Sequence, residues 1–555
     1  MSAEYSPAGV PEMELQTAKP EGLFASFRQS LCRWLKRFFG TPEFSNLYQD
    51  RLKNRFLLRH VALAFGRINQ QSRKQFHQIL QQRFDLDPVH LHRFFDTPLG
   101  NDILNRFSEL VHGQANPEHP ALLRGALLQT ASDPEGFSIL DFFQRLSTHI
   151  PLNPERLIVA VRRVELLLRE TEAIVAEIGQ LATAAVTQEP EIDGAQLPDL
   201  GVVGDRGVDC QQLSLRDRSR DRQFQLVLYT PQRWRKGKTP VIVISHGLGS
   251  GPDDFIEYAE HLASYGYVVA VPQHPGSDLN HIAEMLAGTA PEFFQLQEFI
   301  DRPLDISYVL DELERRNAQE YESRLNLQTV GAIGHSFGGY TVLALAGAGI
   351  DFEKLELACG PINWTPNISM LLQCRALNLP RQAYSFRDPR IAAVLTIDPV
   401  GSEVFGPRGF SQIEIPALLI AGSEDRTAPA ILEQLRIFSW LASPERYLAL
   451  IEGKPHLGNF SRLEAGVKFL LFKVLPNLSI ADLNLFHRYA CVVSLAFLEM
   501  HISQQDRATY QPYLQAAYAA YLSQSPMNLY LLNAAAAESL RPRLQTFMAK
   551  LAALN

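Results

Sequence analysis

A serine set between glycines is the residue whose surroundings most clearly predict chemistry in this chain. The segment Thr329–Leu345, TVGAIGHSFGGYTVLAL, has the pattern of a short apolar strand, a tight glycine turn and an apolar helix. Within it, Gly334–Gly338 matches G-x-S-x-G, in which the serine occupies a strained turn between strand and helix. The flanking glycines avoid a collision with these elements, and the helix N-terminus lies below the hydroxyl. We therefore predict that Ser336 is a nucleophile; the alternative is an inert serine buried in a glycine-rich turn.

A base and an acid must accompany such a serine, because its hydroxyl is a weak nucleophile at neutral pH. His456 lies in a Gly/Pro loop, five residues beyond an apolar segment at Tyr447–Ile451 that is typical of a strand. Asp425 lies in a turn that follows a similar segment, Ala417–Ala421. In the order serine, acid, histidine, the histidine acts as the base and the acid orients its ring. The alternative for His456 is a histidine on a surface loop.

Two further acidic residues compete with Asp425 for the role of the orienting acid. Asp398 ends the preceding apolar segment, Ile391–Ile397, and is followed by Pro399, so its alternative role is to form a turn at the end of that strand. Glu424 is a weaker candidate. Polar groups at the carboxyl ends of parallel strands collect at one edge of a sheet, which favours Asp425 and leaves Asp398 open.

The tetrahedral intermediate of acyl transfer carries a negative oxygen that needs backbone N–H donors. One donor is expected from Phe337, directly after the nucleophile. The other is expected from the loop Ser245–Gly251, SHGLGSG, where glycines let the backbone approach closely. Leu248 is the preferred donor in that loop, and Gly247 is the next candidate. This chemistry requires neither a metal nor a cofactor, and we expect neither.

Strands that alternate with helices must position these loops. Between about residues 224 and 451, short apolar runs typical of buried strands alternate with longer amphipathic segments. This pattern predicts an α/β domain with a mostly parallel sheet and helices on both faces. The predicted strands are Phe224–Tyr229, Val241–Ser245, Tyr267–Val271, Val330–Ile333, Ile391–Ile397, Ala417–Ala421 and Tyr447–Ile451.

Changes in composition divide the rest of the chain. Helical patterns precede and follow the α/β part, and a segment rich in Pro, Gly and Asp comes between the first helical part and the sheet. In the first helical part, Asp87 and Pro88 predict the start of a helix. The predicted divisions are a disordered segment at 1–21, a basic amphipathic helix at 22–57, a helical domain at 58–190, a linker at 191–222, the α/β domain at 223–478 and a helical extension at 479–555.

The composition is that of a globular protein. The 555 residues are 46% hydrophobic and carry a net charge of −8, which argues against binding of nucleic acid. The five cysteines are scattered without a C-x-x-C motif, so we expect free thiols in a reducing compartment and no zinc site. The first residues lack the apolar core of a signal peptide, and no uncharged apolar run is long enough to span a bilayer. These features predict a cytoplasmic location and make no prediction of the oligomeric state.

One segment has the pattern of a helix that packs on the protein body or lies on a membrane surface. Residues 23–40, LFASFRQSLCRWLKRFFG, place apolar side chains at helical spacing and carry four basic residues without an acid. A basic amphipathic helix of this kind can lie on an anionic membrane surface. The alternatives are that its apolar stripe packs on the protein body or binds a partner.

Two apolar insertions are expected near the site. Leu355–Arg390 separates the helix after Ser336 from the next strand, and Ser277–Leu296 follows the strand Tyr267–Val271. At the catalytic edge of the sheet, their side chains would form a wall or lid for an acyl chain. The alternative is ordinary packing of a cap.

Longer segments of the chain resemble known families. Val243–Asp278, VISHGLGSGPDDFIEYAEHLASYGYVVAVPQHPGSD, together with GHSFGG, resembles the platelet-activating-factor acetylhydrolase and serine-type dienelactone-hydrolase-like branch of the α/β-hydrolases. This resemblance covers roughly residues 225–475 and implies the α/β-hydrolase fold. Residues 75–185 resemble a bacterial helical domain of unknown function that precedes such hydrolase domains.

The resemblance also implies roles for individual residues. In the acetylhydrolases the acid follows the strand that carries Asp398 here, whereas most other relatives place it where Asp425 stands. Many dienelactone hydrolases use cysteine where this chain has serine, so their substrate is not carried over. The other implied roles are nucleophile for Ser336, base for His456 and oxyanion donors for the N–H groups of Leu248 and Phe337.

These features together predict a serine hydrolase that cleaves carboxylic esters, lipid esters among them, through an acyl-enzyme intermediate. Its expected ligand is a small acyl ester or lipid. One alternative is a thioesterase or peptidase of the same fold. Another is a catalytically inactive, membrane-peripheral interaction protein, which residues 23–40 favour and the complete set of triad candidates disfavours.

Overall fold

The computed structural model describes residues 83–84, 87–112, 118–134, 136–146, 154–360, 365–456 and 480–554. The segment predicted to be disordered and the basic amphipathic helix at 22–57 lie outside these residues, as does the first part of the helical domain. The membrane contact of residues 23–40 therefore stays a prediction. Within the described ranges, no helix combines the length and the apolar character needed to cross a membrane.

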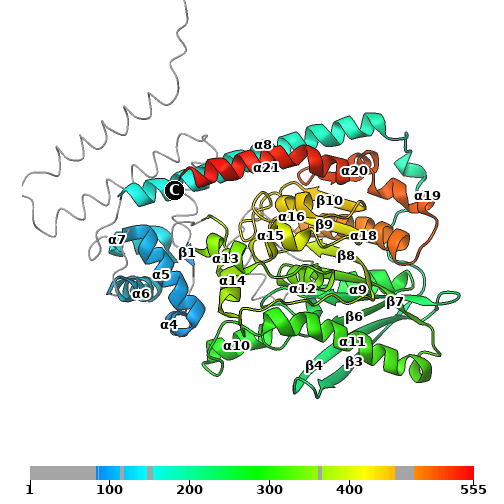
Figure 1. Cartoon of the computed structure of the whole chain (residues 1–555), viewed down its shortest axis with the longest axis horizontal. Helices are drawn as coiled ribbons and strands as arrows, with labels where there is room; N and C mark the ends of the chain where they lie inside the picture. The colour runs from blue at the N-terminus through cyan, green and yellow to red at the C-terminus, as the bar shows by residue number, and fades with distance from the viewer. Residues whose placement is uncertain are drawn as a thin grey trace, which may run out of the picture.

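In the described part of the chain, a nine-stranded sheet forms the centre of the molecule, in the order β11-β10-β9-β8-β7-β5-β6-β4-β3 (Figure 1). The strands from β10 to β6 are parallel, and β11, β4 and β3 are antiparallel to their neighbours. All seven predicted strands are confirmed. The strands span Val208–Asp217 (β3), Arg222–Pro231 (β4), Thr239–Ser245 (β5), Val268–Pro272 (β6), Leu325–His335 (β7), Ile391–Ile397 (β8), Ala417–Gly422 (β9), Arg446–Ile451 (β10) and Leu529–Leu532 (β11).

Alternating side chains of the buried strands belong to two separate hydrophobic cores. On β5, Val241 and Val243 belong to one core, and Ile242 and Ile244 to the other. Helices α11, α12, α16 and α21 cover the first core, and α9 and α18 cover the second. A mostly parallel sheet with buried strands and helices on both faces confirms the predicted fold class. These helices span Ile256–Ser264 (α9), Glu298–Glu320 (α11), Phe337–Leu345 (α12), Gln434–Trp440 (α16), Ile480–His501 (α18) and Ala534–Ala552 (α21).

The helical domain ahead of the sheet has a small core of its own, around Phe95 and Phe142. Its helix α4 starts as predicted, because the Asp87 side chain accepts from the N–H of Val89 at 2.8 Å and Pro88 is the first helical residue. Helix α4 contacts α10, and α5 contacts α14, so this domain lies against both insertions (Figure 1). The helices span Pro88–Asp96 (α4), Pro98–His112 (α5), Glu118–Ala131 (α6), Ile139–Leu146 (α7), Pro154–Gln188 (α8), Leu279–Ala287 (α10) and Met370–Gln373 (α14).

Two strands of the nine-stranded sheet lie where the sequence predicts none. β3 lies inside the predicted linker at 191–222, and β11, at the opposite edge of the sheet, lies inside the predicted helical extension at 479–555. The sequence of β3, VDCQQLSLRD, is mostly polar and exposed, so it carries no strong apolar signal. β11, LYLL, is apolar, but a run of four residues cannot be distinguished from a buried helical segment by its pattern. The extension also places α21 beside α8, where Lys550 and Arg543 pair with Glu170 at 2.9 and 2.8 Å (Figure 1).

The expectation that all cysteines are free thiols is wrong. Cys359 and Cys374 form a disulfide with Cα atoms 5.6 Å apart, whereas Cys210 and Cys491 are free. The bond closes a loop of the insertion at 355–390, after α13 (Phe352–Cys359). Its two cysteines meet because the insertion folds back on itself, which no short motif indicates. Since disulfides persist mainly in oxidising environments, the cysteines no longer support the predicted cytoplasmic location.

Candidate active site

The candidate nucleophile occupies a sharp turn between β7 and α12. Ser336 precedes α12 with φ 53° and ψ −115°, a backbone conformation that is rare outside glycine. Its N–H donates to the carbonyl oxygen of Ile397 at 3.0 Å, and its own carbonyl accepts from the N–H of Tyr340 at 3.2 Å. Strand β8 and helix α12 thus hold a turn whose strain costs about 1–3 kcal/mol.

Two glycines of the turn are required by close packing. A Cβ atom at Gly338 would lie 1.9 Å from the carbonyl oxygen of Ser245, and one at Gly334 would lie 2.1 Å from the carbonyl oxygen of Gly338. Both neighbours are backbone atoms of packed elements, so they cannot move aside cheaply. This is the steric reason for the glycines in the G-x-S-x-G pattern.

The structure brings Ser336, His456 and Asp425 together at the carboxyl edge of the sheet. Nε2 of His456 lies 3.0 Å from Oγ of Ser336, and Nδ1 lies 2.6 Å from Oδ2 of Asp425. The other oxygen of Asp425 accepts from the N–H groups of Thr427 and Ala428, at 2.9 and 2.7 Å. These bonds hold the carboxylate in place, and the three side chains can act as nucleophile, base and orienting acid.

The competing acid, Asp398, has a different partner. Its Oδ2 accepts from the ammonium of Lys454, and its Oδ1 accepts from the N–H of Gly422 at 3.2 Å. Both side chains of the ion pair are buried, with 0% and 1% of their surface exposed. Burial raises the pKa of Asp398 to about 6, while the charge of Lys454 opposes that rise. Asp398 therefore ties β8 to β9 and to the histidine loop. Among the hydrogen bonds of the described residues, the imidazole of His456 bonds to Ser336 and Asp425, and none joins it to Glu424.

One group of side chains at the candidate site has the spacing of a metal site. Among the described residues, the group of acids and histidines close enough to share an ion is Asp398, Asp425 and His456, whose ligand atoms lie within 4.8 Å of one another. The ammonium of Lys454 already supplies a positive charge to this group, and the bonds of His456 to Ser336 and Asp425 occupy both ring nitrogens. The arrangement suits proton transfer better than metal binding.

Asp425 sets the basicity of His456. Burial lowers the pKa of this imidazole, but the charge of Asp425 and its hydrogen bond together raise the pKa by more, so the net shift is upward. The neighbouring His335, with its ring centroid 5.3 Å away, has a pKa held well below 6.5, mainly by burial. His335 is therefore neutral, and His456 is the histidine of this pair that can take up a proton near neutral pH.

The predicted oxyanion loop lies directly against the nucleophile. A Cβ atom at Gly247 would lie 3.4 Å from Cβ of Ser336, so the backbone of this loop contacts the serine. The N–H groups of Leu248 and Phe337 have no acceptor within the described ranges. Phe337 is the first residue of α12, where backbone N–H groups point out of the helix end. Phe337 directly follows Ser336, and Leu248 follows Gly247 in the loop beside it, so the assignment of their N–H groups as oxyanion donors stays a prediction.

Comparison with known families agrees with this architecture. Residues 240–351 match a family model described as alpha/beta hydrolase fold, and this range contains β5 to β7, the oxyanion loop and Ser336. The chain has the α/β-hydrolase fold. A second model, described as alpha/beta hydrolase of unknown function (DUF1400), matches residues 57–153, which include most of the helical domain. No match to a curated protein was found.

Both insertions contact loops of the candidate site. The carbonyl of Ser277 accepts from the N–H of Gly249 in the oxyanion loop at 2.8 Å, and the N–H of Ser369 donates to the carbonyl of Thr427 in the acid loop at 2.8 Å. Buried Glu433 accepts from Ser369 Oγ at 2.9 Å and so fixes the second insertion further. The insertions thus border the site, while their role as an acyl wall stays a prediction.

Two charged side chains that border the candidate site were missed from the sequence. Lys454, which pairs with Asp398, stands two residues before His456, but no motif marks it. Arg302 contacts the oxyanion loop from α11. An arginine inside an amphipathic helix normally indicates a solvated face, so only its burial distinguishes it.

Proposed function

We propose that this α/β hydrolase is a serine esterase that cleaves carboxylic acyl esters, lipid esters among them, through an acyl-enzyme intermediate. The observation that carries the proposal is the pair of contacts on His456, whose Nε2 lies 3.0 Å from Ser336 Oγ and whose Nδ1 lies 2.6 Å from Asp425. A hydrogen-bonded chain in this order activates a serine hydroxyl. The contacts favour Asp425 as the acid, at the position that most relatives other than the acetylhydrolases use.

In the proposed reaction, Oγ of Ser336 attacks the ester carbonyl carbon while Nε2 of His456 takes the hydroxyl proton. The N–H groups of Leu248 and Phe337 stabilise the negative oxygen of the tetrahedral intermediate. Its collapse breaks the bond to the alcohol, which leaves with the proton from His456. Water then attacks the acyl-enzyme in the same way, which releases the carboxylic acid and restores the serine. Asp425 holds the proton-bearing Nδ1 in place throughout.

Lipid esters belong to the proposed substrate class because an exposed apolar side chain lies beside the acid loop. Ile368 of the second insertion is 56% exposed, and the neighbouring Ser369 bonds to the acid loop at Thr427. An acyl chain that leaves the triad on this side would meet an apolar surface. Thioesters and peptides share the same chemical route, so a substrate panel must separate them.

The test compares wild type with Ser336→Ala on p-nitrophenyl acetate, butyrate and octanoate, a matched octanoyl thioester and a peptide p-nitroanilide. We expect oxygen esters to be the best substrates and Ser336→Ala to lose on the order of 10⁴- to 10⁶-fold in kcat. Equal rates for the two proteins would contradict the proposal. A higher kcat/KM for the thioester or the anilide would favour the alternative activities.

A fluorophosphonate probe tests the alternative of an inactive interaction protein. The probe phosphonylates an activated serine, so wild type should be labelled and Ser336→Ala should not. A folded wild-type protein that resists labelling would favour the inactive alternative over the esterase.

A further inference from the structure

Arg302 on α11 contacts both halves of the candidate oxyanion hole from behind. It has 0% of its surface exposed. Nη1 donates to the carbonyl oxygen of His246 at 2.6 Å, and Nη2 donates to that of Gly247 at 3.2 Å. The guanidinium also lies over the ring of Phe337, with Cζ 4.5 Å from the ring centroid. One buried cation therefore contacts the loop and the residue that carry the predicted donors.

The planarity of the peptide bond links these carbonyl groups to the donors. In a trans peptide unit, the C=O and the N–H point in opposite directions. The oxygen of His246 belongs to the same unit as the N–H of Gly247, and the oxygen of Gly247 to the same unit as the N–H of Leu248. When Arg302 holds both oxygens on its own side, both N–H groups point away from it. These are the two loop donors predicted from the sequence.

A second donor reinforces the bond at Gly247. The N–H of His274 donates to Nε2 of His246 at 3.0 Å, so the proton of that ring is on Nδ1, which donates to the Gly247 oxygen at 2.8 Å. Burial holds the pKa of His246 well below its usual value, so this ring stays neutral. The carbonyl of Gly247 thus accepts from Arg302 and His246 together, which leaves its peptide plane little freedom to rotate.

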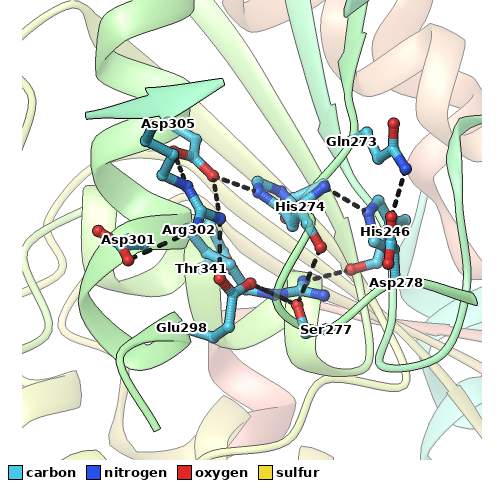
Figure 2. Close-up of polar contacts among 12 residues, drawn as sticks. His246, Gln273, His274, Ser277, Asp278, Glu298, Asp301, Arg302, Asp305 and Thr341 are labelled. Atoms are coloured by element: carbon cyan, nitrogen blue, oxygen red, sulfur yellow. Dashed lines mark hydrogen bonds and ion pairs between the residues drawn. The ribbon is translucent and has the colours of Figure 1, made fainter. Parts of the chain in front are cut away.

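Ser277 and the acidic Glu298 of the same helix contact the guanidinium of Arg302, and Figure 2 draws the three side chains together. Nε of Arg302 donates to Oγ of Ser277 at 2.8 Å and lies 3.5 Å from Glu298. Glu298 and Asp305 in turn pair with Arg222, at 2.8 Å each. Burial lowers the pKa of Arg302 to about 10, against the opposing charges of Glu298 and Asp305, so it is protonated at neutral pH.

We propose that Arg302 is a positioning residue for the oxyanion hole, which orients and polarises the peptide units of the 246–248 loop for the tetrahedral intermediate. This inference rests on the proposed esterase function. The guanidinium does not touch the substrate. Its charge withdraws electron density through the carbonyl groups, which strengthens the N–H donors on the far side of each unit. The benefit is largest when the negative oxygen forms, so the loss of Arg302 should lower kcat and leave KM nearly unchanged.

The test uses Arg302→Lys and Arg302→Met, with Arg222→Lys as the matched control. Arg222 pairs with the same acids, Glu298 and Asp305, but makes no bond to the oxyanion loop among the described residues. A lysine at position 302 keeps the charge but cannot hold two carbonyls with a rigid fork. We expect kcat to fall about 10-fold for Arg302→Lys and up to about 100-fold for Arg302→Met, less than the 10²–10³ for removal of a donor itself. Circular dichroism and thermal unfolding identify which variants are folded. If Arg302→Met does not fold, the comparison of Arg302→Lys with wild type still tests the inference.

A boronic acid provides the readout that distinguishes positioning from simple structural damage. Octylboronic acid adds Ser336 Oγ to its boron while the proton passes to His456, which gives a tetrahedral anion in the oxyanion hole. The inhibition constant should rise by the same factor as kcat falls in the Arg302 variants, whereas KM, kcat and inhibition should stay unchanged in Arg222→Lys. Unchanged kcat and inhibition in folded Arg302 variants, or equal losses in Arg222→Lys, would overturn the inference. A wild type without esterase activity or fluorophosphonate labelling would instead remove the proposed function, and the inference with it.

Discussion

Two aspartates at neighbouring strand ends share a setting but have different partners. Asp398 follows β8, Asp425 follows β9, and both are almost completely buried within reach of His456. Asp425 binds Nδ1 of His456, whereas Asp398 binds the ammonium of Lys454. The comparison indicates that a position at a strand end does not by itself make an acid catalytic. The role of each aspartate depends on the side chain that it binds, the imidazole of His456 or the ammonium of Lys454.

One loop supplies a partner to each aspartate. Lys454 and His456 stand two residues apart after β10, and the ammonium of Lys454 also donates to the carbonyl of Pro455 at 3.0 Å and lies 4.6 Å from the ring centroid of Phe486. A carboxylate that is paired with a buried ammonium has its charge largely compensated. Among the described residues, Asp425 has only backbone N–H donors besides the imidazole, so its charge remains to stabilise the protonated histidine.

The largest expected effect follows from removing the charge of Asp425. In Asp425→Asn the amide no longer accepts reliably from Nδ1, so His456 loses its orientation and correct tautomer, and kcat should fall on the order of 10⁴-fold. Asp398→Asn, measured on folded protein, should lose less than about 10-fold, since it leaves the bond between His456 and Asp425 intact. Steady-state hydrolysis of p-nitrophenyl butyrate measures both. The reverse order of losses would assign the acid to Asp398, as in the acetylhydrolases.

A smaller effect is expected on stability from the ion pair. Lys454→Met leaves the carboxylate of Asp398 buried without its counter-charge, which should lower the free energy of unfolding by about 3–5 kcal/mol. The double variant Lys454→Met, Asp398→Asn removes both charges and should recover much of that loss. Chemical denaturation measures both values. Additive losses in the double variant would show that the two side chains do not depend on each other.

The smallest expected effect is on the pH dependence of kcat/KM. The reaction needs neutral His456, and because Asp425 raises the pKa of this imidazole, activity should fall as the pH drops through a value above 6.5. Replacing either aspartate by asparagine should move this fall in activity to lower pH. The move should be larger in Asp425→Asn than in Asp398→Asn, because Asp425 makes the larger upward contribution to the pKa of His456. If the pH at which activity falls moved equally in the two variants, or moved upward, the distinction between the aspartates would be contradicted.

The strands and the order of the three loops could be predicted because they depend on local patterns. The apolar runs of β5 and β7 to β10 are buried on both faces, so each run is continuous in the sequence. β3 and β11 could not be predicted in the same way. Both are edge strands that pair with one neighbour, β4 or β10; β3 is mostly polar, and β11 is an apolar run of only four residues. The disulfide between Cys359 and Cys374 likewise depends on how an insertion folds back.

By itself, the sequence determined the strand-turn-helix around Ser336, the later positions of an acid and a histidine, and glycines at the oxyanion loop. These follow from steric and periodic rules that act over a few residues. Only the tertiary structure decided that Asp425 binds the imidazole and that Lys454 binds Asp398. It also placed Arg302 behind the oxyanion loop. The reason is physical: burial and charge pairing join groups that are tens to hundreds of residues apart, and their energies depend on distances that no local pattern encodes.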